Sequence, residues 1–156
     1  MKRNNRPIGR PTELMPVNEA DQPGGPTRTA TCQCGQLSIG CAGDPVRISV
    51  CHCLDCQKRS GSSFAAQARF PADQVTITGE SKQWSRVSAE GNGADFHFCP
   101  TCGSTVYYHA RPHRDLVAVA IGAFAEPGFP MLSYSVYESR KHAWVQIVGE
   151  GIDHYE

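Results

Sequence analysis

Hydrophobic residues alternate with polar or small residues in several short stretches between Thr29 and Tyr108. A period of two is typical of strands with one buried face, so each stretch is predicted to be a strand. The run at 116–121 is apolar throughout, which favours a fully buried strand. The alternating sets are Leu37, Ile39 and Cys41; Val46, Ile48 and Val50; Val75 and Ile77; Phe96 and Phe98; and Val106 and Tyr108.

Helical periodicity is weak along the chain. One short helical turn is expected near 55–58, and no long amphipathic helix is indicated. Residues 143–148 suit either another strand or an extended closing segment. No internal repeat of solenoid length is present. We therefore expect a mainly β fold with little helix, in which glycine- and proline-containing turns carry the polar chemistry.

Residues 1–27 differ from the rest of the chain in composition. They contain five prolines and three glycines, with scattered charges and little periodicity. This composition is typical of a flexible arm, because it offers little apolar surface to bury. The alternative is an irregular strap packed on the domain. The predicted organisation is an arm at 1–27 and one domain at 28–156, which is long enough to build a core without disulfides.

Charge and hydropathy narrow the range of partners. The 15 basic and 15 acidic residues balance, and the sequence pI is about 7.0. Nucleic-acid-binding domains usually carry a basic face, so nucleic acid is not an expected partner. No apolar run is long enough to span a membrane, and residues 1–26 lack the apolar stretch of a secretory signal. These features predict a cytoplasmic protein without a membrane partner.

Eight cysteines give the strongest chemical signal, and seven of them fall into three tight motifs. The motifs are CxC at 32–34, CxCxxC at 51–56 and CxxC at 99–102. Eight cysteines could instead form four disulfides in a secreted protein. Cysteines this close in sequence bridge one another poorly, but short turns bring their sulfurs to the tetrahedral geometry of zinc. We therefore expect zinc rather than disulfides.

The first and third motifs are expected to form one closed zinc site. Cys32 and Cys34 would supply two ligands, and Cys99 and Cys102 the other two. Gly103, after the last cysteine, permits a positive φ, so that backbone N–H groups can point at the sulfurs. A closed four-cysteine site leaves no position for a substrate. Its predicted role is to hold distant strands together, with metal-binding energy that is also folding energy.

The second motif supplies three thiolates, from Cys51, Cys53 and Cys56. Three ligands leave a fourth position open to water or substrate, as a catalytic zinc site requires. The alternative is a structural site closed by a further ligand. A cysteine on an alternating apolar face is more often a core residue, and a histidine between two ligands is expected to point away from the metal. The candidates for that fourth ligand are Cys41, His52 and Asp55.

These motifs and their neighbours resemble the glutathione-dependent formaldehyde-activating enzyme family. The resemblance covers about Thr31 to Val145 and leaves the arm outside. A weaker match follows in 134–144, through Tyr134-Ser135-Val136-Tyr137, Ser139-Arg140 and Ala143-Trp144. The motifs that carry it are Cys32-x-Cys34-Gly35; Cys51-His52-Cys53-x-x-Cys56-Gln57-Lys58-x-Ser60-Gly61-Ser62-x-Phe64; and Phe98-Cys99-x-x-Cys102-Gly103-Ser104.

The resemblance implies an Mss4-like fold, built of β-sheets around zinc, with two zinc ions per chain. By the same resemblance, the four-cysteine set is the structural site, and Cys51, Cys53 and Cys56 hold the catalytic zinc. The family position that matches Cys41 is ordinarily apolar. The implied activity is that of a carbon–sulfur lyase that adds glutathione to formaldehyde, giving S-hydroxymethylglutathione.

The same motifs allow other substrates and another function. A different thiol substrate, or a non-catalytic zinc-stabilised binding module, would also fit these motifs. No general base is evident. Glutathione carries two carboxylates and would favour cationic contacts, but each available cation could equally be a surface charge. Those cations are Lys58, Arg59, Arg69 and Arg86, and the residues that could form either a pocket or a turn are Ser60, Gly61, Ser62 and Phe64.

Overall fold

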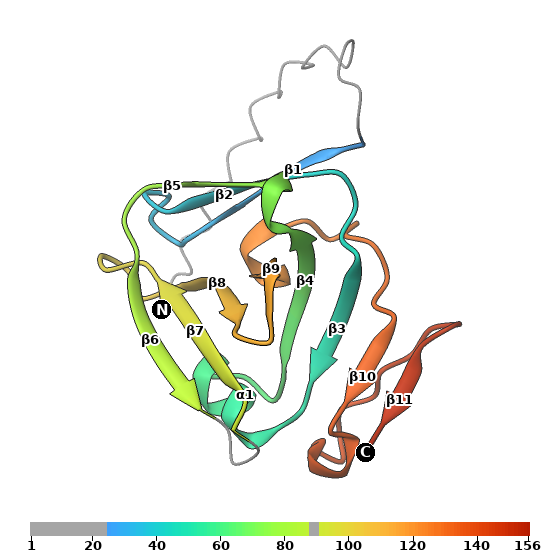
Figure 1. Ribbon diagram of the computed structural model, residues 1–156. Helices are drawn as coiled ribbons and strands as arrows, with labels where there is room; N and C mark the ends of the chain where they lie inside the picture. The colour runs from blue at the N-terminus through green and yellow to red at the C-terminus, as the bar shows by residue number, and fades with distance from the viewer. Residues whose placement is uncertain (1–24, 88–90) are drawn as a thin grey trace, which may run out of the picture.

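A computed structural model describes residues 25–87 and 91–156, and it confirms the mainly β prediction. The strands form a three-stranded sheet and an eight-stranded sheet (Figure 1). The predicted arm at 1–27 lies almost entirely outside the described residues and stays a prediction. The described residues contain no helix with the length and hydropathy that a membrane crossing requires.

The small sheet has the order β1-β2-β5, and both of its pairings are antiparallel. Its strands are β1 (Thr27–Thr31), β2 (Ser38–Ala42) and β5 (Val75–Thr78). In β2, Ile39 and Cys41 are buried while their neighbours are more exposed, which is the predicted alternation. These strands therefore present one apolar face to the rest of the fold.

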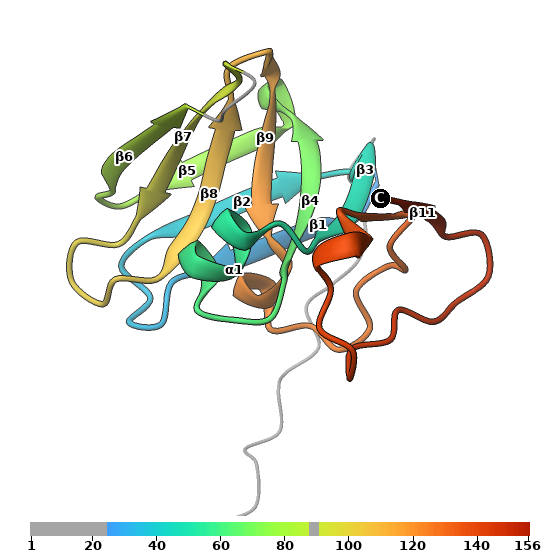
Figure 2. The ribbon, with the colours of Figure 1, turned by 90° about the horizontal axis from the view of Figure 1, so that it is seen from below.

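The large sheet has the order β11-β10-β3-β4-β9-β8-β7-β6. It curves from β6 at one end to β10 and β11 at the other (Figure 2). All its pairings are antiparallel except those of β10 with β3 and with β11. Its strands are β3 (Arg47–Cys51), β4 (Ala65–Pro71), β6 (Lys82–Val87), β7 (Gly93–Phe98), β8 (Thr105–Ala110), β9 (His113–Ala120), β10 (Tyr134–Val136) and β11 (Asp153–Tyr155).

Helical structure is short. The predicted turn near 55–58 is the middle of α1 (Leu54–Ser60). Residues 143–148 lie in no strand, so the strand alternative is wrong; 143–144 form a turn, and Val145 is buried. Three 3-10 turns connect strands, η1 (Ala72–Gln74), η2 (Ile121–Phe124) and η3 (Glu138–Arg140).

The hydrophobic core joins the two sheets. Leu37 and Ile39 come from the β1–β2 hairpin, and Phe70 and Val119 come from the central strands β4 and β9; all four are fully buried. Phe124, in η2, packs on Phe70 with ring centroids 6.2 Å apart. The apolar run predicted to be a buried strand is β9, whose residues Val117, Ala118 and Val119 are all buried.

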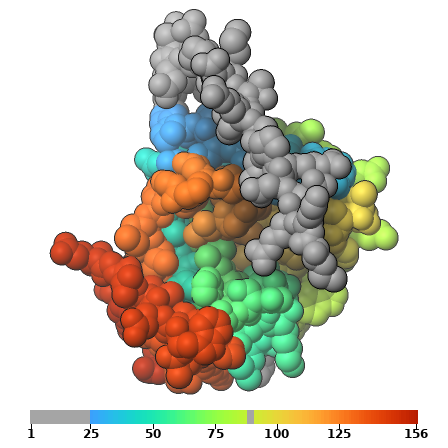
Figure 3. Space-filling model, turned by 180° about the vertical axis from the view of Figure 1, so that it is seen from behind, coloured from blue at the N-terminus to red at the C-terminus, as the bar shows by residue number. Residues whose placement is uncertain are grey.

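The C-terminal segment returns to the large sheet beside β3. Tyr134–Val136 pairs in parallel with 49–51, and the backbone N–H of His52 donates to the Val136 carbonyl at 3.0 Å. In Figure 3 the red C-terminal residues lie against the green residues around α1. The end of the chain therefore backs the stretch that carries the second cysteine motif.

Gly79 marks a close approach within the small sheet, between the end of β5 and the turn that joins β1 to β2, and its replacement by alanine should destabilise the fold. Its φ is +95°, and an added Cβ would lie 1.8 Å from the Gln36 carbonyl oxygen. We expect Gly79→Ala to lose about 2 kcal/mol or more of unfolding free energy, measured by chemical denaturation.

The matched control is Gly61→Ala. Gly61 has a φ of +63°, but a Cβ there meets nothing within 4 Å. This variant should lose only the conformational cost, about 1 kcal/mol. Equal losses of unfolding free energy in the two variants would show that the close contact with Gln36 adds nothing to the cost of the substitution at Gly79.

Candidate metal centres and adjoining cavities

Two turns of the same design bring four cysteines together. In one, the N–H of Gly35 donates to the Cys32 carbonyl at 3.0 Å; in the other, the N–H of Gly103 donates to the Cys99 carbonyl at 2.9 Å. Both glycines have a positive φ, 81° and 76°. Each turn reverses the chain within a few residues, so that the two sulfurs of its motif face the same side.

The four sulfurs have the spacing that a zinc ion needs. The Sγ of Cys34 is 3.6 Å from the Sγ of Cys32 and 3.6 Å from that of Cys99. Tetrahedral zinc with bonds of about 2.3 Å separates its sulfur ligands by roughly 3.8 Å. All four sulfurs of this four-cysteine cluster lie within 4.8 Å of one another, so the cluster could hold a metal ion.

Hydrogen bonds favour the thiolate forms of Cys99 and Cys102. At Cys34 a backbone hydrogen bond from Gln36 acts in the same direction, but burial and hydrogen bonds with the neighbouring thiols outweigh it and raise the pKa to about 12. The Cys99 sulfur accepts from the Gln36 side-chain Nε2 at 2.9 Å and from the Thr101 N–H at 3.4 Å. A hydrogen bond with Ser104 lowers the pKa of Cys102 to about 5. Cysteine must be deprotonated to bind a metal ion, so the hydrogen bonds at Cys99 and Cys102 favour metal binding.

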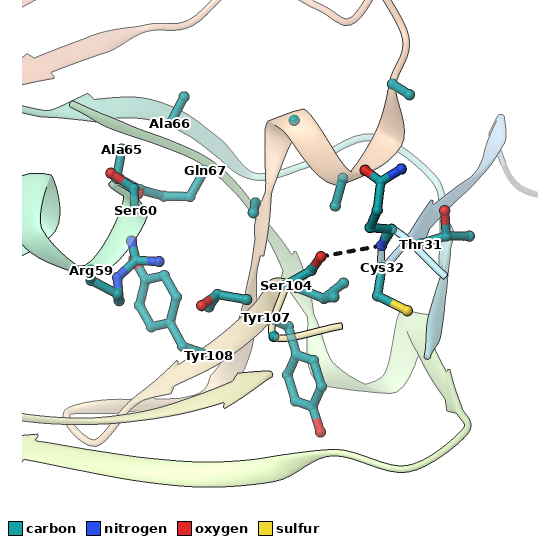
Figure 4. A pocket seen from close by; sticks show the side chains of 18 of the residues that line it. Thr31, Cys32, Arg59, Ser60, Ala65, Ala66, Gln67, Ser104, Tyr107 and Tyr108 are labelled. Atoms are coloured by element: carbon teal, nitrogen blue, oxygen red, sulfur yellow. Dashed lines mark hydrogen bonds between the residues drawn. The ribbon is translucent and has the colours of Figure 1, made fainter. Parts of the chain in front are cut away.

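The cluster also ties the two sheets together. Cys32 and Cys34 follow β1 of the small sheet, whereas Cys99 and Cys102 lie between β7 and β8 of the large sheet. A hydrogen bond from the Gln33 N–H to the Ser104 hydroxyl, 3.2 Å, reinforces the junction (Figure 4). A metal ion in this cluster would therefore bridge segments that are far apart in the sequence.

A second group, the three-cysteine cluster, comprises Cys51, Cys53 and Cys56. Cys51 ends β3, Cys53 caps α1 by accepting from the Cys56 N–H at 3.4 Å, and the three sulfurs lie within 4.8 Å of one another. A hydrogen bond from Cys51 lowers the pKa of Cys56 to about 6. In residues 25–87 and 91–156 no other Cys, His, Asp or Glu atom joins this group, which could hold a metal ion.

The three residues considered as a fourth ligand lie elsewhere. Cys41 is fully buried in the core, and burial raises the pKa of its thiol to about 11. Asp55 is exposed and forms an ion pair with Arg86. His52 is fully buried, and neither of its ring nitrogens joins the group of three sulfurs.

The C-terminal segment forms a hydrogen bond with the His52 ring. Its Nε2 lies 3.3 Å from the Ser135 hydroxyl, which in turn donates to the Glu138 carboxylate. Because Ser135 has one hydrogen to donate, His52 must be the donor in the first contact and carries its proton on Nε2. Its ring also meets Phe64 edge-on, with centroids 5.9 Å apart. His52 therefore supports the cysteine turn from inside the fold.

Glu138 is the charged end of this hydrogen-bonded chain. Partial burial raises the pKa of Glu138, but hydrogen bonds from Lys141, Ser135 and His154 outweigh it and lower the value to about 2. The ammonium of Lys141 lies 2.9 Å from one carboxylate oxygen. The carboxylate stays ionised at neutral pH and fixes the position of Ser135.

Gln57 forms a second link between the cysteine turn and the C-terminal segment. Its Nε2 donates to the carbonyl of His52 at 2.7 Å and to that of Arg140 at 3.1 Å, and its Oε1 lies 3.1 Å from Nε2 of His142. Sequence reasoning gave no role to Gln57, Ser135 or Glu138. Their only signal was their place in or beside the motifs. The contact of Gln57 with Arg140 and that of Ser135 with His52 each join residues 83 positions apart, so the sequence does not show them.

Two hollows flank the end of α1. The smaller, the Cys56 pocket, has a volume of about 330 Å³. Trp84 and Phe96 stack in its wall with centroids 5.8 Å apart. Three of the four cations considered from sequence line it, whereas Arg69 does not. Its lining is Asp55, Cys56, Lys58, Arg59, Trp84, Arg86 and Phe96.

The larger hollow, the Gln67 cavity, has a volume of about 650 Å³ and runs from α1 to the four-cysteine cluster (Figure 4). Ser60 and Phe64 line it, and the Ser60 hydroxyl also donates to the Cys56 carbonyl at 2.8 Å. Gly61 ends α1 in a left-handed conformation. The segment after the cysteines therefore serves both as a turn and as a cavity wall.

Two comparisons with known proteins found similarities to this chain. The family model described as glutathione-dependent formaldehyde-activating enzyme matches residues 27–146, a segment that includes both cysteine clusters. A solved structure titled as the crystal structure of a Rhodobacter sphaeroides protein is similar to this chain, with 19% sequence identity and a TM-score of 0.47. That similarity covers 65% of this chain and 90% of the other.

Cys41 is expected to be replaceable without loss of metal. Cys41→Val keeps an apolar side chain of similar size in the core, so the unfolding free energy should fall by less than about 1.5 kcal/mol. The metal content per folded chain should be unchanged. Phe70→Ala, at another fully buried position, serves as a control and should lose about 3–5 kcal/mol. Release of one metal ion by Cys41→Val would instead identify Cys41 as a ligand.

Proposed function

This chain belongs to the glutathione-dependent formaldehyde-activating enzyme family, and we propose that it is a zinc-dependent enzyme of the carbon–sulfur lyase type. It would add a thiol, with glutathione as the leading candidate, to formaldehyde or a related electrophile. The observation that carries this proposal is the three-cysteine cluster, which has no fourth protein ligand among the described residues and borders a pocket through Cys56.

We assign two zinc ions per chain. Cys32, Cys34, Cys99 and Cys102 would hold the structural ion, because four sulfur ligands complete a tetrahedron. Cys51, Cys53 and Cys56 would hold the second. Zinc bound there would favour the thiolate form of a coordinated thiol, which is the nucleophilic form.

The residues of the Cys56 pocket suit a thiol that carries carboxylates. Arg86 is already paired with Asp55, whereas Lys58 and Arg59 have no carboxylate partner within 4 Å in the part of the chain that the structure describes. Both line the pocket next to Cys56. They would attract the anionic ends of a peptide thiol and hold its sulfur near the cluster.

In the addition, the thiolate sulfur bonds to the carbonyl carbon and the π pair of the carbonyl moves to its oxygen. That oxygen takes up a proton equivalent to the one that the thiol released. Three thiolate ligands would already donate strongly to a bound zinc ion, so the ion would activate the carbonyl group less. Positioning of the two reactants by the surrounding side chains would therefore carry most of the effect.

The two clusters should differ in what their loss does. We expect the purified, reduced protein to contain close to two zinc ions per chain by elemental analysis. Cys34→Ser should unfold the domain, because the four-cysteine cluster joins the sheets. Cys53→Ser should lose one zinc and the activity while keeping the circular dichroism of the fold. Folded, freshly prepared protein with one zinc ion or none would contradict the two-site assignment.

Glutathione binding should release a proton, because the thiol must be deprotonated to join a metal site. Calorimetric titrations in buffers of different ionisation enthalpy measure that release. Exchange NMR at equilibrium should then show glutathione–formaldehyde interconversion faster than without protein, and Cys53→Ser should abolish the difference. If glutathione neither binds nor releases a proton, a different thiol or a non-catalytic zinc module becomes the better assignment.

A further inference from the structure

The Gln67 cavity is much larger than formaldehyde requires. Its volume of about 650 Å³ lies within the range of pockets that enclose ligands of many atoms. Much of its wall is made of residues with small side chains or none, which leaves the space open. These residues are Ala65, Ala66, Gly103, Ala120, Gly122, Ala123 and Ala125.

One residue that lines this space has a buried polar atom without a partner. Gln67, on β4, is only 5% exposed, and its Nε2 donates to the Ser49 hydroxyl at 2.9 Å. The other end of its carboxamide, Oε1, is buried and has no hydrogen-bond partner. An unsatisfied buried acceptor is costly, so the cavity suits a ligand that brings an O–H or N–H group to Oε1.

Arg59 stands where the cavity and the Cys56 pocket meet. It lines both hollows, and Cys56 lines the smaller one beside it. The guanidinium carbon lies 4.8 Å from the ring centre of Phe96 and 5.7 Å from that of Tyr108, while Nε has no hydrogen-bond partner. A carbonyl oxygen that gains negative charge beside the thiolate would find a fixed donor here.

We propose that the Gln67 cavity binds the electrophile, and that this electrophile is a polar aldehyde larger than formaldehyde. Its carbonyl would face Arg59, and a hydroxyl or amide hydrogen would reach Gln67 Oε1. The proposal rests on the thiol addition proposed above. The atoms balance as in that addition: a sulfur–carbon bond forms, the carbonyl π bond breaks, and the oxygen takes up one proton for the one the thiol loses.

The test compares three aldehydes with glutathione and the zinc-loaded full chain: glyceraldehyde, propanal and formaldehyde. Exchange NMR gives each acceleration relative to the uncatalysed reaction of the same pair. We expect the largest acceleration for glyceraldehyde, since propanal has the same carbon chain without hydroxyls. Equal acceleration of glyceraldehyde and propanal, or acceleration of formaldehyde alone, would overturn the proposal while leaving the proposed function in place.

Gln67→Leu removes the acceptor at nearly constant size. It should reduce the acceleration of glyceraldehyde about tenfold, the equivalent of one lost hydrogen bond, and leave formaldehyde unchanged. Gln83→Leu, on the exposed strand β6 and outside the cavity, is the matched control and should change neither. An unchanged glyceraldehyde rate in folded Gln67→Leu protein would contradict the role of Oε1.

A second variant keeps the test informative if Gln67→Leu fails to fold. Gly122 lines the cavity, and a Cβ added there meets no atom within 4 Å. Gly122→Leu should therefore reduce the space, suppress glyceraldehyde addition and spare formaldehyde. Loss of all three activities together with loss of glutathione binding would instead show that the cavity holds the thiol, and it would overturn the proposal while leaving the proposed function in place.

Discussion

The junction at the four-cysteine cluster is the constraint on which the rest of the structure depends. Cys34 and Cys99 approach to 3.6 Å although 65 positions separate them, and they belong to turns of different sheets. The core between the sheets is small, with fully buried side chains such as Leu37 and Phe70 at its centre. A metal ion would add binding energy that is available only when both turns are folded. The cluster therefore couples hairpin formation to the docking of the sheets.

The same junction forms one end of the Gln67 cavity, through Cys32 and Ser104. The other end is α1, whose first turn belongs to the three-cysteine cluster. The helix lines the cavity through Arg59 and Ser60 rather than through the three cysteines, and the two clusters depend on different neighbours. The four-cysteine cluster is held by two hairpin turns, whereas the three-cysteine cluster is held by β3 and the C-terminal segment. A defect in the three-cysteine cluster can therefore leave the four-cysteine cluster in place.

The sequence was informative where chemistry is local. Close cysteine spacing predicted both clusters, alternation predicted strands such as β2, and a continuous apolar run predicted β9, because each signal lies within a few residues. It did not reveal β4, whose segment Ala65–Pro71 is rich in alanine, or β10 and β11, which are three residues long. Gln57 and Ser135 were missed for a related reason. Their partners lie 83 positions away, and only the parallel pairing of β10 with β3 brings them together.

The proposed addition of a thiol to an aldehyde determines what the residues of this chain must do. Thiols add to aldehydes reversibly and without assistance, so a useful catalyst must supply orientation rather than a difficult chemical step. The arrangement around Arg59 suits that requirement, because Arg59 borders both hollows and lines the smaller one together with Cys56. Two reactants that entered from opposite sides of α1 would meet beside one fixed donor. Two separate hollows can hold a peptide thiol and a polar aldehyde at the same time, whereas in a single pocket the two would compete for the same space.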